Sequence, residues 1–303
     1  MISPSKISVT VVTGFLGAGK TTFINQVLKS YPDIQFALVE NEFGEVSIDS
    51  KLIKGVDASQ MFELKQGCIC CTISDEYELV LAELAERFPN VEHLLIETTG
   101  IADPAPVISP FFKDEKLKKV YQFSGTVCIV DALNFTNQLK EDVTLKQVAV
   151  ADLVIISKME KVSESEKQNL IVEINRINPL CEISCSGRDT ATDYNPNHVF
   201  YKTKFYLEMP VKRLPHSGIT SKTLSFQKPL NRKDFINWLS YNLDVYKTQI
   251  YRVKGILCFE NEPYEFILQG VGGSFEITEG ENLSENFISQ VILIGIEIPE
   301  LEY

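Results

Sequence analysis

The most constraining feature of this sequence is a glycine-rich stretch near its N-terminus, residues 14–22, with the sequence GFLGAGKTT. It fits the P-loop pattern G-x-x-x-x-G-K-[ST]. A β-branched run at residues 7–13 precedes it, and residues 23–29, whose apolar positions have helical spacing, follow it. Between a strand and a helix, the backbone N–H groups of such a loop and the helix N-terminus form a concave anion site. The context therefore predicts a P-loop that binds nucleotide phosphates.

The side chains of this loop have separate expected roles. We expect Lys20 to reach the β- and γ-phosphates and the Thr21 hydroxyl to bind Mg²⁺. A second element, residues 91–100, is an apolar strand that ends on Glu97 and is followed by Gly100. It resembles a Walker B strand, which predicts that Glu97 lies beside Mg²⁺ and that the Gly100 N–H senses a γ-phosphate. The expected nucleotide contacts in the loop are Gly14, Gly17, Ala18, Gly19, Lys20, Thr21 and Thr22, and the expected catalytic residues are Lys20, Thr21 and Glu97.

A tetrapeptide after the predicted strand 153–156 bears on base recognition. In GTPases an [NT]KxD box at this place binds guanine through its acid, while the lysine stem covers the base. Here the box contains Ser157, Lys158 and Glu160. Both ends of the box depart from the pattern, with Ser157 first and Glu160 last. Because Glu carries one more methylene than Asp, the bidentate contact with guanine requires a shift of the backbone, and we expect a weakened preference for guanine.

The composition limits which partners the protein can bind and where in the cell it can be located. The chain has 303 residues and a formal net charge of −12, which argues against a nucleic-acid backbone as a partner because phosphate contacts need clustered Lys and Arg. No apolar run approaches the roughly 20 residues that cross a bilayer, and the first residues lack the apolar core of a signal peptide. We therefore expect a cytoplasmic protein that binds neither nucleic acid nor membrane.

Three of the 7 cysteines crowd together as Cys68, Cys70 and Cys71. A strand-to-turn backbone can converge these thiolates on one soft cation and leave a fourth position open. Buried cysteines or a redox pair, since Cys68 and Cys71 also form C-x-x-C, are the alternatives. An acidic loop at residues 40–49 has the place of a switch segment, although its carboxylates could form a solvated face. We expect the other four cysteines, Cys128, Cys181, Cys185 and Cys258, to be small buried hydrophobes.

The sequence divides into two predicted domains. We expect a doubly wound, mostly parallel α/β domain over residues 1–187, a polar linker over 188–219 and a small α+β domain over 220–303. In the last domain the patterns predict strands around residues 224–226, 255–259, 264–269 and 291–298 and a helix over 231–243. Residues 251–255, YRVKG, either direct basic groups toward the first domain or form a solvated strand start.

Taken together, the motifs resemble those of the CobW family of P-loop GTPases, relatives of the nickel-insertion GTPases of urease and hydrogenase. The similarity runs nearly end to end, through GFLGAGKTT, ENEFGE, GCICC, ETTGIADP, QVAVADLVIISK, RVKG and LIGIEIP. It implies GTP hydrolysis coupled to binding of zinc, cobalt or nickel and delivery of that metal to a client metalloprotein. It implies GTP, GDP and Mg²⁺ at the sites above. The metal ligands that it implies are Cys68, Cys70 and Cys71 for the transported metal, with Glu40, Glu42 and Glu45 as oxygen ligands near it, and Thr21 and Glu97 for Mg²⁺.

Two other functions remain open on the sequence. One is a regulatory or scaffold GTPase in which the C-x-C-C thiols hold a structural zinc, and the other is a thiol-redox protein regulated by nucleotide. Within the motifs no His or Arg is an obvious base or arginine finger, and such a finger is worth about 10³ to 10⁵ in rate. We therefore expect a low intrinsic rate of hydrolysis. We also expect the C-terminal domain to contact a client or a second protomer of a homo-oligomer.

Overall fold

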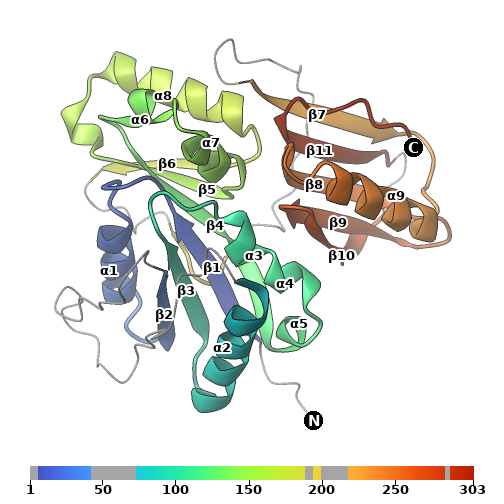
Figure 1. Ribbon diagram of the computed structural model, residues 1–303, viewed down its shortest axis with the longest axis horizontal. Helices are drawn as coiled ribbons and strands as arrows, with labels where there is room; N and C mark the ends of the chain where they lie inside the picture. The colour runs from blue at the N-terminus through green and yellow to red at the C-terminus, as the bar shows by residue number, and fades with distance from the viewer. Residues whose placement is uncertain (1–5, 42–72, 188–193, 199–217, 284–286) are drawn as a thin grey trace.

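The computed structural model describes residues 6–41, 73–187, 194–198, 218–283 and 287–303, which form two β-sheets (Figure 1). The first sheet has the strand order β2-β3-β1-β4-β5-β6, and every neighbouring pair is parallel. Its strands are β1 (Ile7–Thr13), β2 (Phe36–Asn41), β3 (His93–Thr98), β4 (Tyr121–Asp131), β5 (Leu153–Ser157) and β6 (Glu182–Gly187). Because the strands run in one direction, their carboxyl ends gather at a single edge, where such folds bind ligands.

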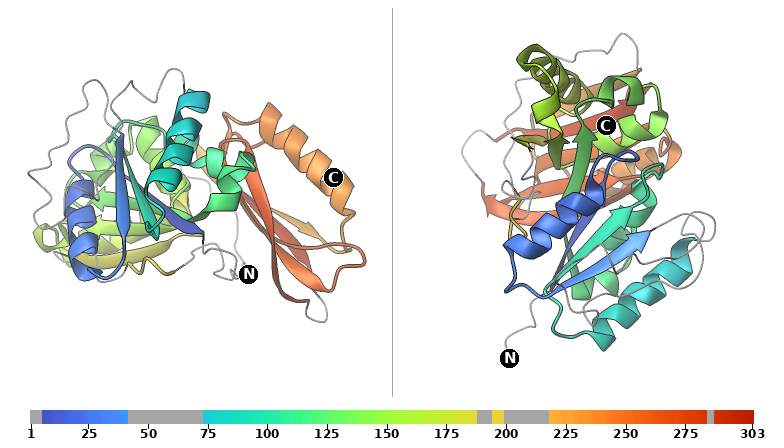
Figure 2. Two further views of the ribbon diagram at one scale, coloured as in Figure 1. Left: turned by 90° about the horizontal axis from the view of Figure 1, so that it is seen from below. Right: turned by 90° about the vertical axis from the view of Figure 1, so that its left-hand side faces the viewer.

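Helices cover both faces of this sheet (Figures 1 and 2). On one face, α1 (Lys20–Ser30) packs Phe23, Ile24 and Val27 against the sheet, and the remaining helices pack on the other face. These are α2 (Ile73–Arg87), α3 (Ala105–Ile108), α4 (Pro110–Lys113), α5 (Leu117–Val120), α6 (Phe135–Gln138), α7 (Asp142–Ala149) and α8 (Glu164–Ile177), with a 3₁₀ turn at Met159–Lys161. α8 begins with a capping box between Ser163 and Glu166. Among the described helices none has the length and apolar content needed to cross a membrane.

The second sheet is antiparallel, in the order β10-β9-β8-β11-β7. Its elements are β7 (Ile219–Phe226), α9 (Arg232–Val245), β8 (Ile250–Cys258), β9 (Tyr264–Val271), β10 (Ser274–Asn282) and β11 (Ser289–Ile296). Successive residues of a strand point to opposite faces. In β11, Val291 and Leu293 accordingly join the core under α9, whereas Ile292 and Ile294 join the core shared with the first sheet. The second sheet thus lies between α9 and the first sheet's helices.

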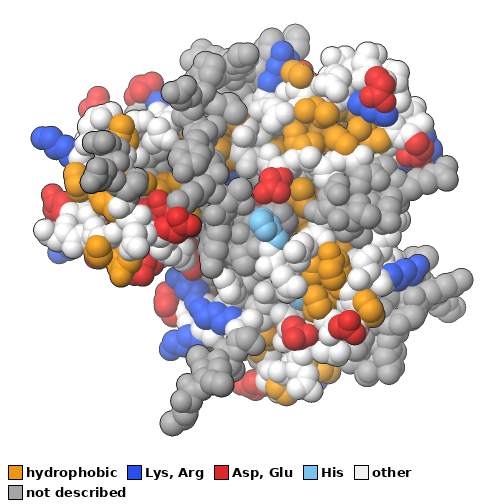
Figure 3. Space-filling view, turned by 180° about the vertical axis from the view of Figure 1, so that it is seen from behind, with side chains coloured by type: hydrophobic (Ala, Val, Ile, Leu, Met, Phe, Trp, Pro, Cys, Tyr) orange, Lys and Arg blue, Asp and Glu red, His pale blue; other side chains and the backbone are white. Residues whose placement is uncertain are grey.

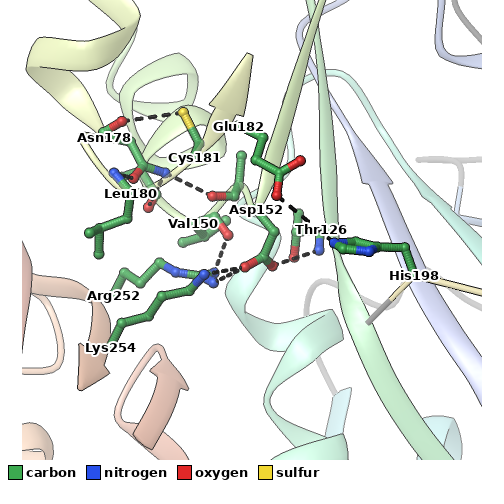
Figure 4. A network of polar contacts seen from close by, with 12 residues as sticks. Thr126, Val150, Asp152, Asn178, Leu180, Cys181, Glu182, His198, Arg252 and Lys254 are labelled. Atoms are coloured by element: carbon green, nitrogen blue, oxygen red, sulfur yellow. Dashed lines mark hydrogen bonds and ion pairs between the residues drawn. The ribbon is translucent and has the colours of Figure 1, made fainter. Parts of the chain in front are cut away.

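A buried ionic cluster joins the two sheets (Figure 4). Asp152, which precedes β5, pairs with Arg252 and, at 2.7 Å, with Lys254, both from β8. Arg252 also donates to the carbonyl of Val150. Burial alone would raise the pKa of Asp152, but the two cations outweigh it and hold the pKa low. Residues 251–255 therefore direct their basic groups into the first domain and do not form a solvated strand start.

A second buried polar group lies on the α1 side of the first sheet. The Nε2 atom of His93 lies 3.0 Å from the Thr10 hydroxyl and 3.2 Å from the Tyr194 hydroxyl, which in turn donates to Thr10 at 3.0 Å. Tyr31 donates to the carbonyl of Tyr194 at 2.6 Å. Tyr194 is 1% exposed. Residues 194–198, inside the predicted linker, are thus fixed to the first sheet.

The predicted fold class is confirmed, and several elements were not predicted. β10 was not predicted, because its sequence SFEITEGEN is polar and carries no run of buried residues. The short helices α3, α4, α5, α6 and α7 were not predicted either. β4 runs from Tyr121 to Asp131, with Gly125 inside it. On the face seen in Figure 3, acidic and basic side chains are interspersed.

Candidate nucleotide site

The P-loop connects the end of β1 to the start of α1, as its sequence predicts. Gly14 has φ +139°, and a Cβ at this position would lie 2.2 Å from the carbonyl oxygen of Ile129 in β4. Gly19, with φ +105°, is the N-cap of α1 and offers no side chain to the first turn. Only glycine fits the first position, and the second leaves the N–H groups of α1 open toward an anion.

Lys20 lies deep in this loop and is 8% exposed. Its Nζ donates to the carbonyls of Gly14 at 3.0 Å and Phe15 at 3.4 Å. Burial lowers the pKa of Lys20, and the charge of Glu97 acts in the opposite direction. A buried ammonium surrounded by carbonyls gains stability from a nearby anion, and a phosphate in the loop would supply one.

Thr21 and Glu97 meet at the carboxyl edge of the sheet. The Thr21 hydroxyl donates to the two carboxylate oxygens of Glu97 at 3.2 and 3.4 Å. Beneath them, the Thr98 hydroxyl donates to that of Thr13 at 2.9 Å, which ties the ends of β3 and β1 together. A hydroxyl and a carboxylate are hard oxygen donors of the kind that Mg²⁺ takes. The pair therefore fits the predicted Mg²⁺ site.

The predicted guanine box begins at the last residue of β5 and contacts the P-loop. The Ser157 hydroxyl donates to the carbonyl of Ala18 at 2.7 Å, and Lys158 Nζ donates to the carbonyl of Gly17 at 2.9 Å. Lys158 has φ +59°, a left-handed conformation that is uncommon outside glycine. Glu160 lies in the 3₁₀ turn Met159–Lys161. The box and the P-loop are therefore held as one unit.

Asp131, at the end of β4, is a residue of this site for which the sequence predicted no role. It lies 2.7 Å from Lys158 Nζ and accepts from the Asn134 amide at 2.7 Å. Burial alone would raise the pKa of Asp131, but the hydrogen bonds from Lys158, Asn134 and the Leu133 N–H lower it. Asp131 fixes the lysine stem beside the P-loop. An acid directly after a buried strand was the available signal.

The structure does not describe the side chains of the predicted ligands of the transported metal. Cys68, Cys70, Cys71, Glu42 and Glu45 lie outside the described residues, and Glu40 is described only through its backbone in β2. Within the described ranges, no group of three or more His, Cys, Asp or Glu side chains is arranged to hold a metal ion. All these ligand assignments stay predictions.

Among the described residues, none of the other four cysteines forms a disulfide, and one of them corrects the prediction. Cys128 and Cys258 are buried and Cys181 is partly buried, but Cys185 is exposed. Cys185 lies in β6, the edge strand of the first sheet. The expectation of a buried hydrophobe is therefore wrong for Cys185, because an edge strand leaves a face open to solvent.

Comparison with known proteins places this geometry in a family. Residues 8–184 match the CobW/HypB/UreG nucleotide-binding domain, and residues 219–302 match the C-terminal domain of the cobalamin synthesis protein CobW. The chain belongs to the CobW/HypB/UreG family. This confirms the resemblance read from the motifs.

Several proteins similar to this chain have names that refer to zinc. The zinc chaperone YjiA of Escherichia coli is 31% identical over 98% of this chain and 96% of its own length. The zinc-regulated GTPase metalloprotein activator 1 of Schizosaccharomyces pombe is 27% identical over 95% of this chain and 82% of its own length. A crystal structure of the Zn(II)-bound YjiA GTPase from E. coli superposes with a TM-score of 0.68 at 29% identity, covering 97% of this chain and 96% of that one. The predicted GTPase class is confirmed at the level of the family.

Proposed function

We propose that this chain is a GTPase that couples GTP binding and slow hydrolysis to the binding of zinc and its delivery to a client protein. The observation that carries the proposal is the register of β2 on β3, which pairs Glu40 with Glu97 and Asn41 with Thr98. The segment 42–72, which contains Cys68, Cys70 and Cys71, follows β2 in the sequence. The chain therefore enters that segment from the edge of the sheet at which Glu97 meets Thr21.

The nucleotide chemistry follows from the P-loop and its neighbours. Lys20 would stabilise the β- and γ-phosphates, because its ammonium group is buried and gains stability from a nearby anion. Thr21 and Glu97 would hold Mg²⁺, which neutralises the charge that develops on the transferred phosphoryl group. The Gly100 N–H would contact the γ-phosphate. Lys158, held by Asp131, would cover the base, with Ser157 and Glu160 completing the guanine site.

The metal chemistry rests on the adjacent thiols. Three thiolates suit zinc, and a fourth position left for a carboxylate, water or a partner's ligand favours exchange over storage. Similar proteins named as zinc chaperones support zinc over cobalt and nickel. The ligands are Cys68, Cys70 and Cys71, with Glu40, Glu42 and Glu45 near them. Delivery to a client, a cytoplasmic location and assembly into oligomers belong to the same proposal, as do the domain boundaries at residues 187 and 219.

The experiment measures zinc affinity by competition with a chromophoric chelator, in GDP and in a non-hydrolysable GTP analogue. Typical couplings between two sites are about 1–3 kcal/mol, so the two affinities should differ by about 5-fold to 150-fold. Linkage requires that zinc change the affinity for the GTP analogue by the same factor. Equal zinc affinities in both nucleotides would refute delivery and leave a structural zinc in a regulatory GTPase.

Cys70→Ser is the matched variant for this experiment. It should weaken zinc binding and remove the nucleotide dependence, because a hydroxyl is a poor ligand for a soft cation. A nucleotide dependence that persists in Cys70→Ser would place the coupled metal elsewhere. Titration of free thiols with and without chelator tests the redox alternative, since a metal hides thiols without oxidising them.

A further inference from the structure

The turn that follows the Walker B strand is held by a buried glutamine of α7. Gln147 is 1% exposed, and its Nε2 donates to the carbonyls of Gly100 and Ala102, both at 3.2 Å. Gly100 packs directly on the P-loop, because a Cβ there would lie 2.5 Å from the backbone nitrogen of Leu16. Gln147 therefore acts on a peptide that touches the nucleotide site.

The orientation of this amide is fixed by its neighbours. Both atoms that face it are carbonyl oxygens, so only the nitrogen of Gln147 can be directed at Gly100 and Ala102. The amide oxygen, Oε1, is buried and has no hydrogen-bond partner among the described residues. A buried acceptor without a donor destabilises the arrangement that contains it. Gln147 therefore holds the turn while its own Oε1 atom stays without a donor among the described residues.

An ion pair holds the same turn one residue further along. Lys146 Nζ lies 2.8 Å from Asp103 Oδ2, while Asp103 Oδ1 accepts from the Ala105 N–H at 3.0 Å. Lys146 also lies over the ring of Tyr251, 5.5 Å from its centroid. Tyr251 belongs to β8 of the second sheet and is 8% exposed. The cation that fixes the turn is therefore itself placed by the C-terminal sheet.

The C-terminal end of α7 is anchored to the same strand. Arg252 of β8 donates to Val150 and pairs with Asp152, and Lys254 pairs with Asp152 (Figure 4). These contacts follow α7 immediately in the chain, so α7 cannot shift independently of β8.

The residues that follow the turn rest on the β9–β10 hairpin. A Cβ at Gly272, which has φ +58°, would lie 2.8 Å from the Cβ of Ala105. The hydroxyls of Ser109 and Ser274 form a hydrogen bond. The segment from Gly100 to Ser109 therefore lies between α7 and the second sheet.

We propose that the C-terminal sheet sets the response of the nucleotide site to the γ-phosphate by holding the turn Gly100–Asp103 through α7, with Gln147 and Lys146 as positioning residues. The inference rests on the proposed function, because it takes Gly100 as the group that senses the γ-phosphate. It adds that contacts far from the nucleotide determine how strongly GTP is distinguished from GDP.

The test compares the affinities of a non-hydrolysable GTP analogue and of GDP, without zinc, in the full chain. Lys146→Met keeps the aliphatic stem and removes the charge, and Gln147→Met keeps the volume and removes both hydrogen bonds. Tyr251→Leu removes the ring from the second sheet, and Tyr251→Phe keeps it. We expect the ratio of the two affinities to change by fivefold or more in Lys146→Met, Gln147→Met and Tyr251→Leu.

Two controls separate positioning from loss of fold. Lys167→Met removes a lysine from the pair with Glu164, on the exposed face of α8, and should leave the ratio within twofold of wild type, as should Tyr251→Phe. The double variant of Lys146→Met and Tyr251→Leu should show less than the product of the two single effects, because both act through one contact. A structural defect alone would weaken both nucleotides equally and leave the ratio unchanged.

Ratios within fivefold of wild type in all three test variants would overturn the inference. If the wild type itself binds the two nucleotides with distinct affinities, such a result refutes only the role of α7. A wild-type chain that binds the two nucleotides equally would also overturn this inference, because there would be no discrimination for the second sheet to set; the proposed function is tested separately, by the zinc affinities.

Discussion

Lowering the pH from 7 to 5 should destabilise this protein through one buried histidine. His93 is 2% exposed, and burial lowers its pKa from 6.5 to about 4, although a hydrogen bond to the backbone of Pro196 acts in the opposite direction. The Tyr194 hydroxyl donates to Thr10, whose own hydroxyl faces Nε2 of His93. This chain of hydrogen bonds is complete when Nε2 accepts, and protonation of Nε2 would break it.

The sign and size of the effect follow from linkage. A histidine whose folded-state pKa is depressed favours the folded state while it is neutral, so its contribution is fully present above pH 6.5. The contribution is lost as the pH falls through the interval from 6.5 to about 4. Across the whole interval the loss amounts to about 3 kcal/mol of unfolding free energy, of which about 2 kcal/mol is lost by pH 5.

The assay is urea-induced unfolding at pH 7 and pH 5 for the wild type and for His93→Gln. The amide of glutamine can accept from Thr10 but does not titrate, so the variant should lose about 2 kcal/mol less than the wild type between the two pH values. His198→Gln is the control, because the side chain of His198 is 44% exposed. It should reproduce the wild-type loss.

Two results would refute this reasoning. One is an equal loss of stability between pH 7 and pH 5 in wild type and His93→Gln. The other is a direct titration of the His93 ring by NMR in the folded protein that places its pKa near 6.5 and not at about 4.

Three further changes test separate parts of the molecule. Lys20→Ala should abolish nucleotide hydrolysis while leaving the unfolding midpoint nearly unchanged, since backbone and glycines shape the loop; hydrolysis at the wild-type rate would contradict the P-loop assignment. Glu160→Asp should tighten GDP binding relative to ADP, by about 1.5–3 kcal/mol for a restored hydrogen bond to a charged group; calorimetry that finds equal or weaker GDP binding would contradict this account of the guanine box. Asp152→Asn should destabilise the fold by about 3–5 kcal/mol, because it leaves two buried cations without their anion. Glu164→Gln, in an exposed pair, is its control, and equal midpoints in urea unfolding for the two variants would disprove the role of the buried cluster.

The parts of the site that could be predicted are those encoded locally. The P-loop spans nine residues whose glycines are required by the backbone itself, as the close approach of Gly14 to Ile129 shows. Glu97 could be predicted because an acid at the end of an apolar strand must lie at the carboxyl edge of a parallel sheet. The contact between Thr21 and Glu97, which are 76 residues apart, followed from that placement.

Other elements could not be predicted because their cause is tertiary. β10 is polar and only partly buried, and its partner β9 supplies the pairing that its own sequence does not indicate. The polar stretch at residues 188–219 resembled a plain linker, yet Tyr194 is buried against Phe23 and bonded to Thr10. Nothing near Tyr194 in the sequence indicates this contact, because its partners lie in β1, β3 and α1.

The distribution of these contacts bears on what the second sheet contributes. The phosphate-binding residues of the P-loop would bind phosphate in any sheet with this topology, since their geometry is set within one strand, one loop and one helix. The turn Gly100–Asp103 is different, because its hold depends on Gln147, which lies 47 residues away in the chain, and on Lys146 over Tyr251 of β8. A chain that kept every nucleotide motif but lacked β8 would retain the phosphate site and lose the contact that places Lys146. Such a chain should still bind nucleotide, and under the proposal its affinities for GTP and GDP should lie closer together than those of the full chain.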